Sequence, residues 1–505
     1  MTKKNIFEFL KANWFLIILV VLAALLRLYN FKNTLMFLGD QARDVAIVRE
    51  FLTELDPIIV GPTTSVGKIQ LGPFYYYFMA PFLLLANFSP LGPALTIAFL
   101  GILTIPVLYF VIKQMFDKST ALIAATLYTF SNVIITNTRF SWNPNPMPFV
   151  IILLIWSIYQ VYEHKKYQFI IWVFALFAIA LQLHYMVILL APGLVFLYLL
   201  IWFSEKKKKL LYQNTLWGFL VFFLFAVPLI IFDLVKDFLN TKGILEFVAK
   251  GNHAPRTFGT IINSLYNRIY QSIGQILGLR EVLPFAKIVS YFSFVAFLLL
   301  SYFNRLKKNY QIILTLYLSG ILGLVIFSGD VYEHYLGFMY PLTFIIVALL
   351  LNFVWQKLTF GKFLVAIFIF VVIFFNLKYY RFYKSLGWTI DDTQKLSKVI
   401  AEDAGSDPYN IILLDETKDY RAMQYRYFLT KTQIKDYGDF KVDTLYLISQ
   451  WDYQDIETLE TRELEAFFDA RLMQMTKEDN ARFLQDKVLK TWYFDNGPYV
   501  YKLKK

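Results

Sequence analysis

The sequence predicts an all-α polytopic membrane domain over residues 1–384, followed by a small α/β soluble domain over residues 385–505. The first observation is composition. Of the 505 residues, 57% are hydrophobic and 19% aromatic, and the mean hydropathy of +0.50 is far above that of a soluble globular protein. The second is charge: before residue 385 the chain holds 32 Lys and Arg against 15 Asp and Glu, and after it 17 against 22. The net charge of +12 is therefore the sum of +17 in the apolar part and −5 in the remainder, which indicates membrane lipids and not nucleic acid as partners.

Eleven apolar runs are each close to the length that a helix needs to cross about 30 Å of hydrocarbon. Backbone polar groups must be satisfied internally in lipid, so we expect each run to form a transmembrane helix. The runs cover residues 12–29, 91–112, 119–136, 147–162, 167–183, 186–203, 211–232, 284–303, 310–327, 335–354 and 361–377.

A twelfth run, Gly72–Phe88, is apolar too, but it is short and holds Pro81 in its middle. If it does not cross, six short basic segments with 16 Lys and Arg all fall on the side of the N-terminus, and the short loops opposite hold only Arg139. The positive-inside rule then places the N-terminus in the cytoplasm. It also predicts that Gly72–Phe88 is a re-entrant or surface-lying helix in a long first outer loop, residues 30–90.

The chain after residue 385 has the pattern of a soluble fold on the extracytoplasmic side. Ile411–Leu414 and Leu445–Ile448 are typical of short buried strands, and residues 418–430 between them are typical of a helix. The sequence has no cysteine, which excludes a disulfide framework and a thiolate metal site.

The first outer loop opens with an acidic motif, Gly39-Asp40-Gln41-Ala42-Arg43-Asp44. If a helix starts there, Asp40 and Asp44 share one face, and Arg43 lies one turn from Asp40. Two interpretations are open. Asp40 is either an N-terminal helix cap, which the spacing alone favours, or a reactive carboxylate.

Further polar and aromatic residues are predicted at the same outer interface. Each has a simple explanation by itself, because Tyr and Trp form interfacial belts, Asn-Pro makes turns, and a His at a helix end is more often structural than catalytic. Together they indicate a cavity that suits an anionic lipid headgroup bearing a polar group. They are Lys68, Tyr75, Tyr76, Arg139, Trp142, Asn143, His184, Glu333, His334 and Tyr335.

The acidic motif in a long first outer loop, the run Gly72-Pro73-Phe74-Tyr75-Tyr76-Tyr77, the many spans and the outward C-terminal domain resemble one known family. They are similar to the GT-C fold glycosyltransferases, specifically the protein O-mannosyltransferase and aminoarabinose transferase superfamily, over residues 10–380. The resemblance implies transfer of a hexosyl or pentosyl group from a polyprenyl phosphate carrier to a hydroxyl on a protein, lipid or glycan. It further implies inversion at the anomeric carbon, and a general base that falls on Asp40.

This chemistry asks for a carboxylate that takes the proton of the acceptor hydroxyl, and for cations that hold the charge of the leaving phosphate. Asp40 is the expected base, with Asp44 as the other carboxylate of the motif. Lys68 and Arg139 are the expected cations, and Arg43 either joins them or pairs with Asp44. The aromatic cluster Tyr75 to Tyr77 and Trp142 is expected to stack on the sugar or to line the prenyl groove. The further residues expected in the substrate pocket are Asn143, His184, Glu333, His334 and Tyr335.

Two departures from the family pattern bear on metal binding. Many members have Asp-Glu where this chain has Asp40-Gln41, and many carry an acid in the second outer loop, where this chain has Asn143 and Asn145. Hard divalent cations prefer several carboxylate oxygens. We therefore expect metal-independent chemistry without a cofactor.

The main alternative is a polytopic lipid or sugar transporter or flippase without transferase chemistry, and a second is a non-catalytic receptor with an outward domain. The charged residues cluster at one interface and not near the midplane, and no pair of broken spans indicates inverted repeats, which favours the enzyme. We expect a multi-pass protein of a prokaryotic plasma membrane that acts on the cell envelope.

Overall fold

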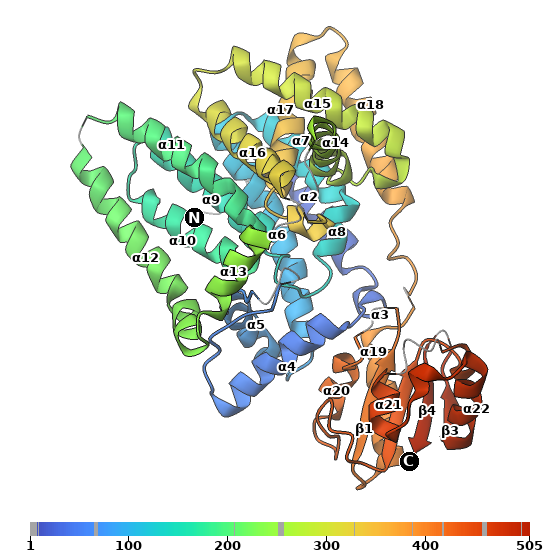
Figure 1. Cartoon of the computed structure of the whole chain (residues 1–505). Coiled ribbons are helices and arrows are strands. Elements are labelled where there is room, and N and C mark those ends of the chain that lie inside the picture. The colour runs from blue at the N-terminus through green and yellow to red at the C-terminus, as the bar shows by residue number, and fades with distance from the viewer. Residues whose placement is uncertain are drawn as a thin grey trace. The chain divides into compact units, whose positions relative to one another are not determined.

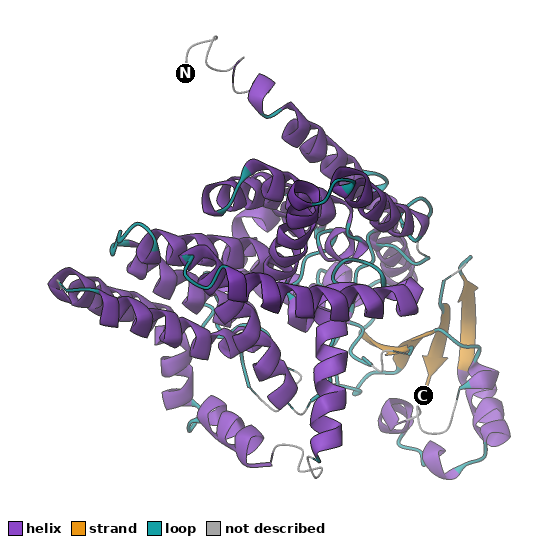
Figure 2. Cartoon of the chain, turned by 90° about the horizontal axis from the view of Figure 1, so that it is seen from above, coloured by secondary structure: helices purple, strands orange, loops and turns teal. Residues whose placement is uncertain are grey.

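The computed structural model describes residues 8, 10–64, 69–206, 208–250, 257–327, 329–385, 387–416, 419–456, 462–495 and 497–505. The chain divides into two compact units. Unit 1 comprises Met1–Tyr29 and Phe51–Tyr380, and unit 2 comprises Asn30–Glu50 and Arg381–Lys505. Helices dominate, and the β-strands gather in one small sheet near the C-terminus (Figure 2), which confirms the predicted fold class.

Unit 1 is built from helices, labelled in Figure 1. Short 3-10 turns, η1 (Tyr185–Leu190), η3 (Arg280–Val282) and η4 (Glu333–Leu336), and a π-helical turn, η2 (Gln271–Gln275), join several of them. The α-helices are α2 (Trp14–Leu28), α5 (Phe74–Leu85), α6 (Leu91–Met115), α7 (Lys118–Phe130), α8 (Asn132–Asn137), α9 (Met147–Tyr162), α10 (Phe169–Leu183), α11 (Ala191–Ser204), α12 (Lys208–Val235), α13 (Leu239–Lys250), α14 (Phe258–Tyr270), α15 (Leu283–Phe303), α16 (Lys308–Ile326), α17 (Tyr340–Lys357) and α18 (Gly361–Lys378).

Each of the eleven predicted runs contains a helix. By length and composition, seven helical stretches among the described residues can cross a membrane: Leu91–Met115, Tyr185–Ser204, Lys208–Val235, Arg280–Phe303, Lys308–Ile326, Tyr340–Lys357 and Gly361–Lys378.

The other predicted spans are shorter than expected. Helices α2, α9 and α10 have 15, 16 and 15 residues. The run 119–136 is broken at Ser131, whose extended backbone ends α7 and whose hydroxyl accepts a hydrogen bond from the N–H of Ile134 to start α8. Helix α5 has 12 residues, about 18 Å at 1.5 Å per residue, which is too short to cross and agrees with a re-entrant or surface-lying helix.

Unit 2 holds the helices α3 (Phe31–Thr34) and most of α4 (Gly39–Glu54) together with the C-terminal part of the chain. A four-stranded sheet has the order β1-β2-β4-β3, in which β1 and β2 run parallel and the other pairs are antiparallel. The elements are α19 (Ile390–Ala404), β1 (Tyr409–Leu414), α20 (Met423–Leu429), β2 (Thr444–Ser449), η5 (Tyr453–Asp455), α21 (Arg462–Phe468), η7 (Leu472–Gln474), α22 (Lys477–Lys487), β3 (Val488–Tyr493) and β4 (Tyr499–Lys504).

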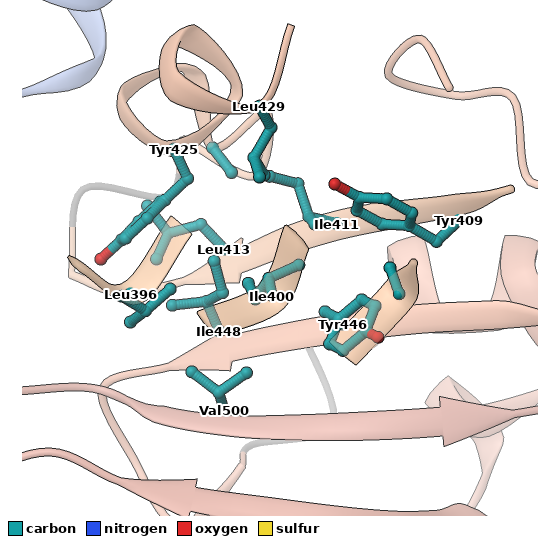
Figure 3. Close-up of a cluster of buried hydrophobic side chains, with 12 residues drawn as sticks. Leu396, Ile400, Tyr409, Ile411, Leu413, Tyr425, Leu429, Tyr446, Ile448 and Val500 are labelled. Carbon is teal, nitrogen blue, oxygen red and sulfur yellow. The ribbon is translucent and has the colours of Figure 1, made fainter. Parts of the chain in front are cut away.

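The sheet is covered on both faces, as the continuous apolar runs in β1 and β2 require. All six residues of β1 are buried. On one face, Ile411 and Leu413 of β1 pack with Tyr425 and Leu429 of α20 (Figure 3), and Ile412 packs on the other face in a cluster that includes residues of α21 and α22. The two predicted strands are confirmed, whereas the predicted helix 418–430 is shorter and begins only at Met423.

The division into units differs from the predicted boundary at residue 385, because the first-loop segment Asn30–Glu50 belongs with the C-terminal part. The ring of Phe37 packs edge-on against Tyr427 at 5.8 Å between centroids. The guanidinium of Arg49 lies 4.2 Å from the centre of the Tyr427 ring and donates to its carbonyl at 3.1 Å. These non-local contacts fix the start of α4 within unit 2.

Candidate functional site

The acidic motif forms the first two turns of α4 in unit 2, and Arg43 links its two carboxylates. The Nη1 of Arg43 donates to Asp40 at 2.7 Å, and its Nε and Nη2 donate to Asp44 at 3.0 and 2.7 Å. The side chain of Asp40 is 56% exposed, whereas that of Asp44 is 2% exposed. Asp40 lies inside the helix and not at its N-cap, and its carboxylate is open to a substrate. Asp44 is a buried partner of Arg43.

Asp419 of unit 2 lies directly against the start of α4. A Cβ added to Gly39 would lie 2.1 Å from Oδ2 of Asp419, so this close approach depends on the missing side chain of Gly39. Burial raises the pKa of Asp419, and the charges of Asp40 and Asp415 add to that effect. The surroundings of Asp40 therefore include a second carboxyl group that the sequence pattern did not single out.

In unit 1, four of the predicted site residues form one aromatic cluster, contributed by three loops. The ring of His334 lies 4.3 Å from Trp142, 4.6 Å from Tyr335 and 5.9 Å from His184, measured between centroids. His184 in turn lies 4.7 Å from Tyr335. The sequence prediction that these residues share one region is therefore supported by their geometry.

The end of α10 is held so that His184 faces this cluster as a neutral ring. Its Nδ1 accepts a hydrogen bond from the N–H of Met186 at 3.3 Å, and Asn143 donates to the carbonyl of Leu183 at 2.6 Å. Burial lowers the pKa of His184, with a smaller contribution from His334. The ring therefore acts as a neutral hydrogen-bonding group at neutral pH.

Glu333, next to the cluster, is held by neutral donors. Its two carboxylate oxygens accept hydrogen bonds from the side-chain amides of Asn137 at 3.2 Å and Gln275 at 3.3 Å. The hydroxyl of Tyr340 donates to the backbone carbonyl of Glu333 at 3.1 Å. The two amides orient the carboxyl group, whose oxygens can accept further hydrogen bonds from a hydroxyl group.

Arg268 on α14 is a candidate that the sequence analysis missed. It donates to Gln271 at 2.8 Å and to the carbonyls of Leu324 and Gly329 at 3.3 and 3.4 Å. Burial lowers its pKa, an effect that the charge of Asp330 opposes. Its signal in the sequence was the polar spacing of Arg268, Gln271 and Gln275 at positions i, i+3 and i+7 on an otherwise amphipathic helix.

The other predicted residues have structural contacts. Tyr75 and Tyr76 are each 1% exposed, and the hydroxyl of Tyr75 bonds to Ser141 at 2.6 Å. Arg139 is 4% exposed and donates to the carbonyls at the end of α2, those of Leu26, Arg27 and Tyr29, at 2.7 to 3.2 Å. This geometry compensates the unpaired carbonyls of a helix C-terminus. Lys68 lies outside the described residues.

Among the residues that the structure describes, no group of three or more His, Asp and Glu side chains is placed to hold a metal ion. The expectation of metal-independent chemistry stays a prediction.

Residues 70–232 match the model of one protein family, dolichyl-phosphate-mannose-protein mannosyltransferase. No curated protein matches the sequence. The matched residues run from the end of the first outer loop to α12 and include Tyr75, Arg139, Trp142 and His184.

Solved structures with the same fold cover nearly the whole chain. ArnT from Cupriavidus metallidurans in the apo state has a TM-score of 0.62 at 12% identity, with 97% of this chain and 98% of that chain covered. ArnT bound to undecaprenyl phosphate has a TM-score of 0.59 at 13% identity and the same coverage. The archaeal oligosaccharyltransferase AglB from Archaeoglobus fulgidus, in complex with an inhibitory peptide and a dolichol-phosphate, has a TM-score of 0.56 at 12% identity, with 97% and 74% covered. The fold is GT-C, which confirms the resemblance drawn from the sequence.

Proposed function

We propose that this multi-pass membrane protein is a glycosyltransferase that moves a sugar from a polyprenyl phosphate carrier to an acceptor hydroxyl on the extracytoplasmic face, with inversion. The observation that carries the proposal is the GT-C fold, shared over 97% of this chain with an ArnT structure that binds undecaprenyl phosphate. The match to a mannosyltransferase family model over residues 70–232 supports the same reaction class.

In this proposal Asp40 is the general base. A base must be open to the acceptor hydroxyl and must be ionised when the hydroxyl attacks. The side chain of Asp40 is 56% exposed, and it accepts a hydrogen bond from Arg43 at 2.7 Å, which orients it. In the proposed transfer, the acceptor oxygen forms a bond to the anomeric carbon, the bond between that carbon and the carrier phosphate breaks, and the hydroxyl proton moves to Asp40.

The cluster in unit 1 is proposed to bind the donor sugar. Trp142 and His334, which are partly exposed, supply aromatic faces for a sugar ring, and Tyr335, which is buried, packs against His334. Glu333 supplies a hydrogen-bond acceptor held by two amides. Arg268 joins Lys68 as a proposed cation for the carrier phosphate. Arg139 is reassigned to holding the end of α2, because it is only 4% exposed and its guanidinium donates to three carbonyls there, whereas Arg268 is half-buried.

The test uses the purified chain in proteoliposomes with undecaprenyl-phosphate-linked mannose or aminoarabinose that carries a radiolabel on the sugar. Release of undecaprenyl phosphate and transfer of label to cell-envelope acceptors support the proposal, and the anomeric coupling constant of the product gives the stereochemistry. Asp40→Asn is expected to stop transfer, and Asp56→Asn, at an exposed acid of the same loop, is the matched control. Movement of intact donor across the bilayer without loss of the sugar would instead support the flippase.

A further inference from the structure

Unit 1 contains an apolar groove between α9, α10, α11 and α12. Its volume of 350 Å³ is more than twice the ~150 Å³ of an engineered cavity that holds benzene. The residues of α10 that line the groove lie in the first half of the helix, and His184 follows the opposite end of α10. The lining side chains are Ile158, Val161, Ile170, Val173, Phe174, Phe177, Ala191, Leu194, Val195, Leu197, Tyr198, Ile201, Thr215, Phe219 and Phe222.

The chemistry of this lining selects a hydrocarbon chain. Its two hydroxyl groups, on Tyr198 and Thr215, bond to each other at 3.0 Å, and Thr215 also donates to the carbonyl of Leu211. The other lining side chains carry no polar atom. A sugar placed there would lose its hydrogen bonds with water without replacement, whereas an acyl chain would keep its apolar surroundings.

A close helix crossing forms one wall of the groove and leaves its outer side to the bilayer. A Cβ on Gly218 would lie 2.4 Å from the ring of Phe174, so glycine permits α12 to approach α10 here. The ring of Phe219 then lies 4.7 Å from that of Phe174. Only 6% of the apolar stretch of α12 is buried within the protein, so a lipid can enter the groove sideways from the bilayer.

One end of the groove is strongly basic. Helices α9 and α10 are joined there by a turn with Lys165 and Lys166, and α11 and α12 by a segment with four consecutive lysines, 206–209. Lys165 pairs with Glu205 at 3.3 Å and Lys166 donates to Gln160 at 3.1 Å, and both are exposed, as are Lys206 and Lys209. Lys208 lies 3.5 Å from the centre of the Trp202 ring, beside the groove. Such charges attract an anionic headgroup at the membrane surface.

The length of the groove distinguishes a membrane phospholipid from the polyprenyl phosphate carrier as its ligand. On α11 it extends from Ala191 to Ile201, about 15 Å at 1.5 Å per residue, or one leaflet of a ~30 Å hydrocarbon core. A carrier whose phosphate lies beside His184 would have its headgroup at the opposite end. We propose that the groove binds an anionic phospholipid from the leaflet at the basic end, with one acyl chain between α11 and α12 and its phosphate at Lys166, Lys206, Lys208 and Lys209.

The test measures lipid binding directly and does not depend on transfer activity. The detergent-purified full chain is mixed with dioleoyl phosphatidylglycerol or dioleoyl phosphatidylcholine, and retained lipid is measured by native mass spectrometry and by the shift in Tm. We expect one tightly retained phosphatidylglycerol and a larger Tm shift than with phosphatidylcholine. Replacing Lys206, Lys208 and Lys209 with Gln should weaken phosphatidylglycerol binding by about fivefold per lysine.

Two variants on α11 test the groove itself. Leu194→Trp fills it and should abolish retention of both lipids, whereas Leu199→Trp, on an exposed face that does not line the groove, should not. If Leu194→Trp does not fold, the lysine variant decides, with Lys307, Lys357 and Lys362→Gln as its charge-matched control. Equal retention of the two lipids by the wild type, or displacement of phosphatidylglycerol by equimolar undecaprenyl phosphate, would overturn the proposal.

Discussion

Asp40 and Asp44 lie one turn apart on α4 and both bond to Arg43, yet the structure predicts opposite effects for their amide variants. Asp40 is more than half exposed, and Asp44 is almost fully buried. We therefore expect Asp40→Asn to remove turnover while the protein stays folded. Asp44→Asn should lower stability while the folded fraction keeps most of its turnover.

The magnitudes follow from the two environments. An exposed pair such as Asp40 and Arg43 contributes about 0–1 kcal/mol to stability, whereas loss of a general base slows turnover by about 10²–10⁴-fold, or about 3–5 kcal/mol in activation free energy. Breaking a buried pair costs about 3–5 kcal/mol in stability. Because both N–H groups of Arg43 donate to the same oxygen of Asp44, and an amide oxygen in that position still accepts them, we expect the lower end, about 3 kcal/mol, for Asp44→Asn.

Both quantities are measured on the same preparations. Stability is taken from thermal unfolding in detergent, and turnover from release of the carrier phosphate per folded molecule, with donor binding measured separately. If Asp40→Asn keeps more than about a tenth of wild-type turnover, against the expected loss of 10²-fold or more, Asp40 is not the base. If Asp44→Asn leaves the Tm unchanged but stops turnover, the assignment of the two carboxylates is reversed.

Three further predictions test other parts of the molecule. Asn87→Cys, in this cysteine-free chain, should be labelled from outside the cell by an impermeant reagent, and labelling only from the cytoplasm would refute a re-entrant α5. Glu333→Gln should raise the KM for the donor about tenfold with a smaller change in kcat, because a hydrogen bond to a charged group contributes about 1.5–3 kcal/mol; an unchanged KM would remove Glu333 from the donor site. Burial raises the pKa of Asp403, but hydrogen bonds from Lys490, Lys502 and Tyr446 outweigh it and lower the pKa to about 2. Ionised Asp403 therefore stabilises the fold at pH values above its usual pKa of 3.8. In unfolding measurements at pH 7, Asp403→Asn should lower the free energy of unfolding by about 1 kcal/mol, a value reduced for the exposure of Lys490, and this difference should vanish as the pH falls from 3.8 towards 2.

The helices of unit 1 and the first two strands of unit 2 were predictable because their signals are local. A run of about 20 apolar residues has few alternatives to a helix in lipid. The runs Ile411–Leu414 and Leu445–Ile448 are apolar at every position, as strands buried on both faces must be. The grouping of Trp142, His184 and His334 was also predictable, since alternating spans bring their loops to one side.

The signals that failed are those that depend on distant parts of the chain. Strand β3 (Val488–Tyr493) has strand-favouring residues but no regular alternation of apolar and polar positions, and it exposes Leu489 and Lys490, so its sequence does not indicate which face is buried. In the sequence, Arg139 has the pattern of a functional cation in an outer loop. Only the structure shows that its guanidinium donates hydrogen bonds to three carbonyls at the end of α2. Charge and spacing cannot distinguish a phosphate ligand from a helix cap when the acceptor lies more than a hundred residues away.

The position of Asp40 within unit 2 makes its proposed chemistry depend on the aromatic packing of the C-terminal part. The ring of Tyr427 contacts the first-loop segment twice, at the ring of Phe37 and at the guanidinium of Arg49. Tyr427→Ala removes both ring contacts and keeps only the hydrogen bond from Arg49 to the backbone carbonyl, so it should loosen the start of α4. Because general-base catalysis needs the carboxylate within hydrogen-bond reach of the acceptor, turnover should fall at least tenfold while donor binding, assigned to unit 1, stays unchanged. Tyr493→Ala, at a ring 70% exposed on β3, is the matched control, and equal effects of the two variants would show that anchoring of α4 does not set the rate.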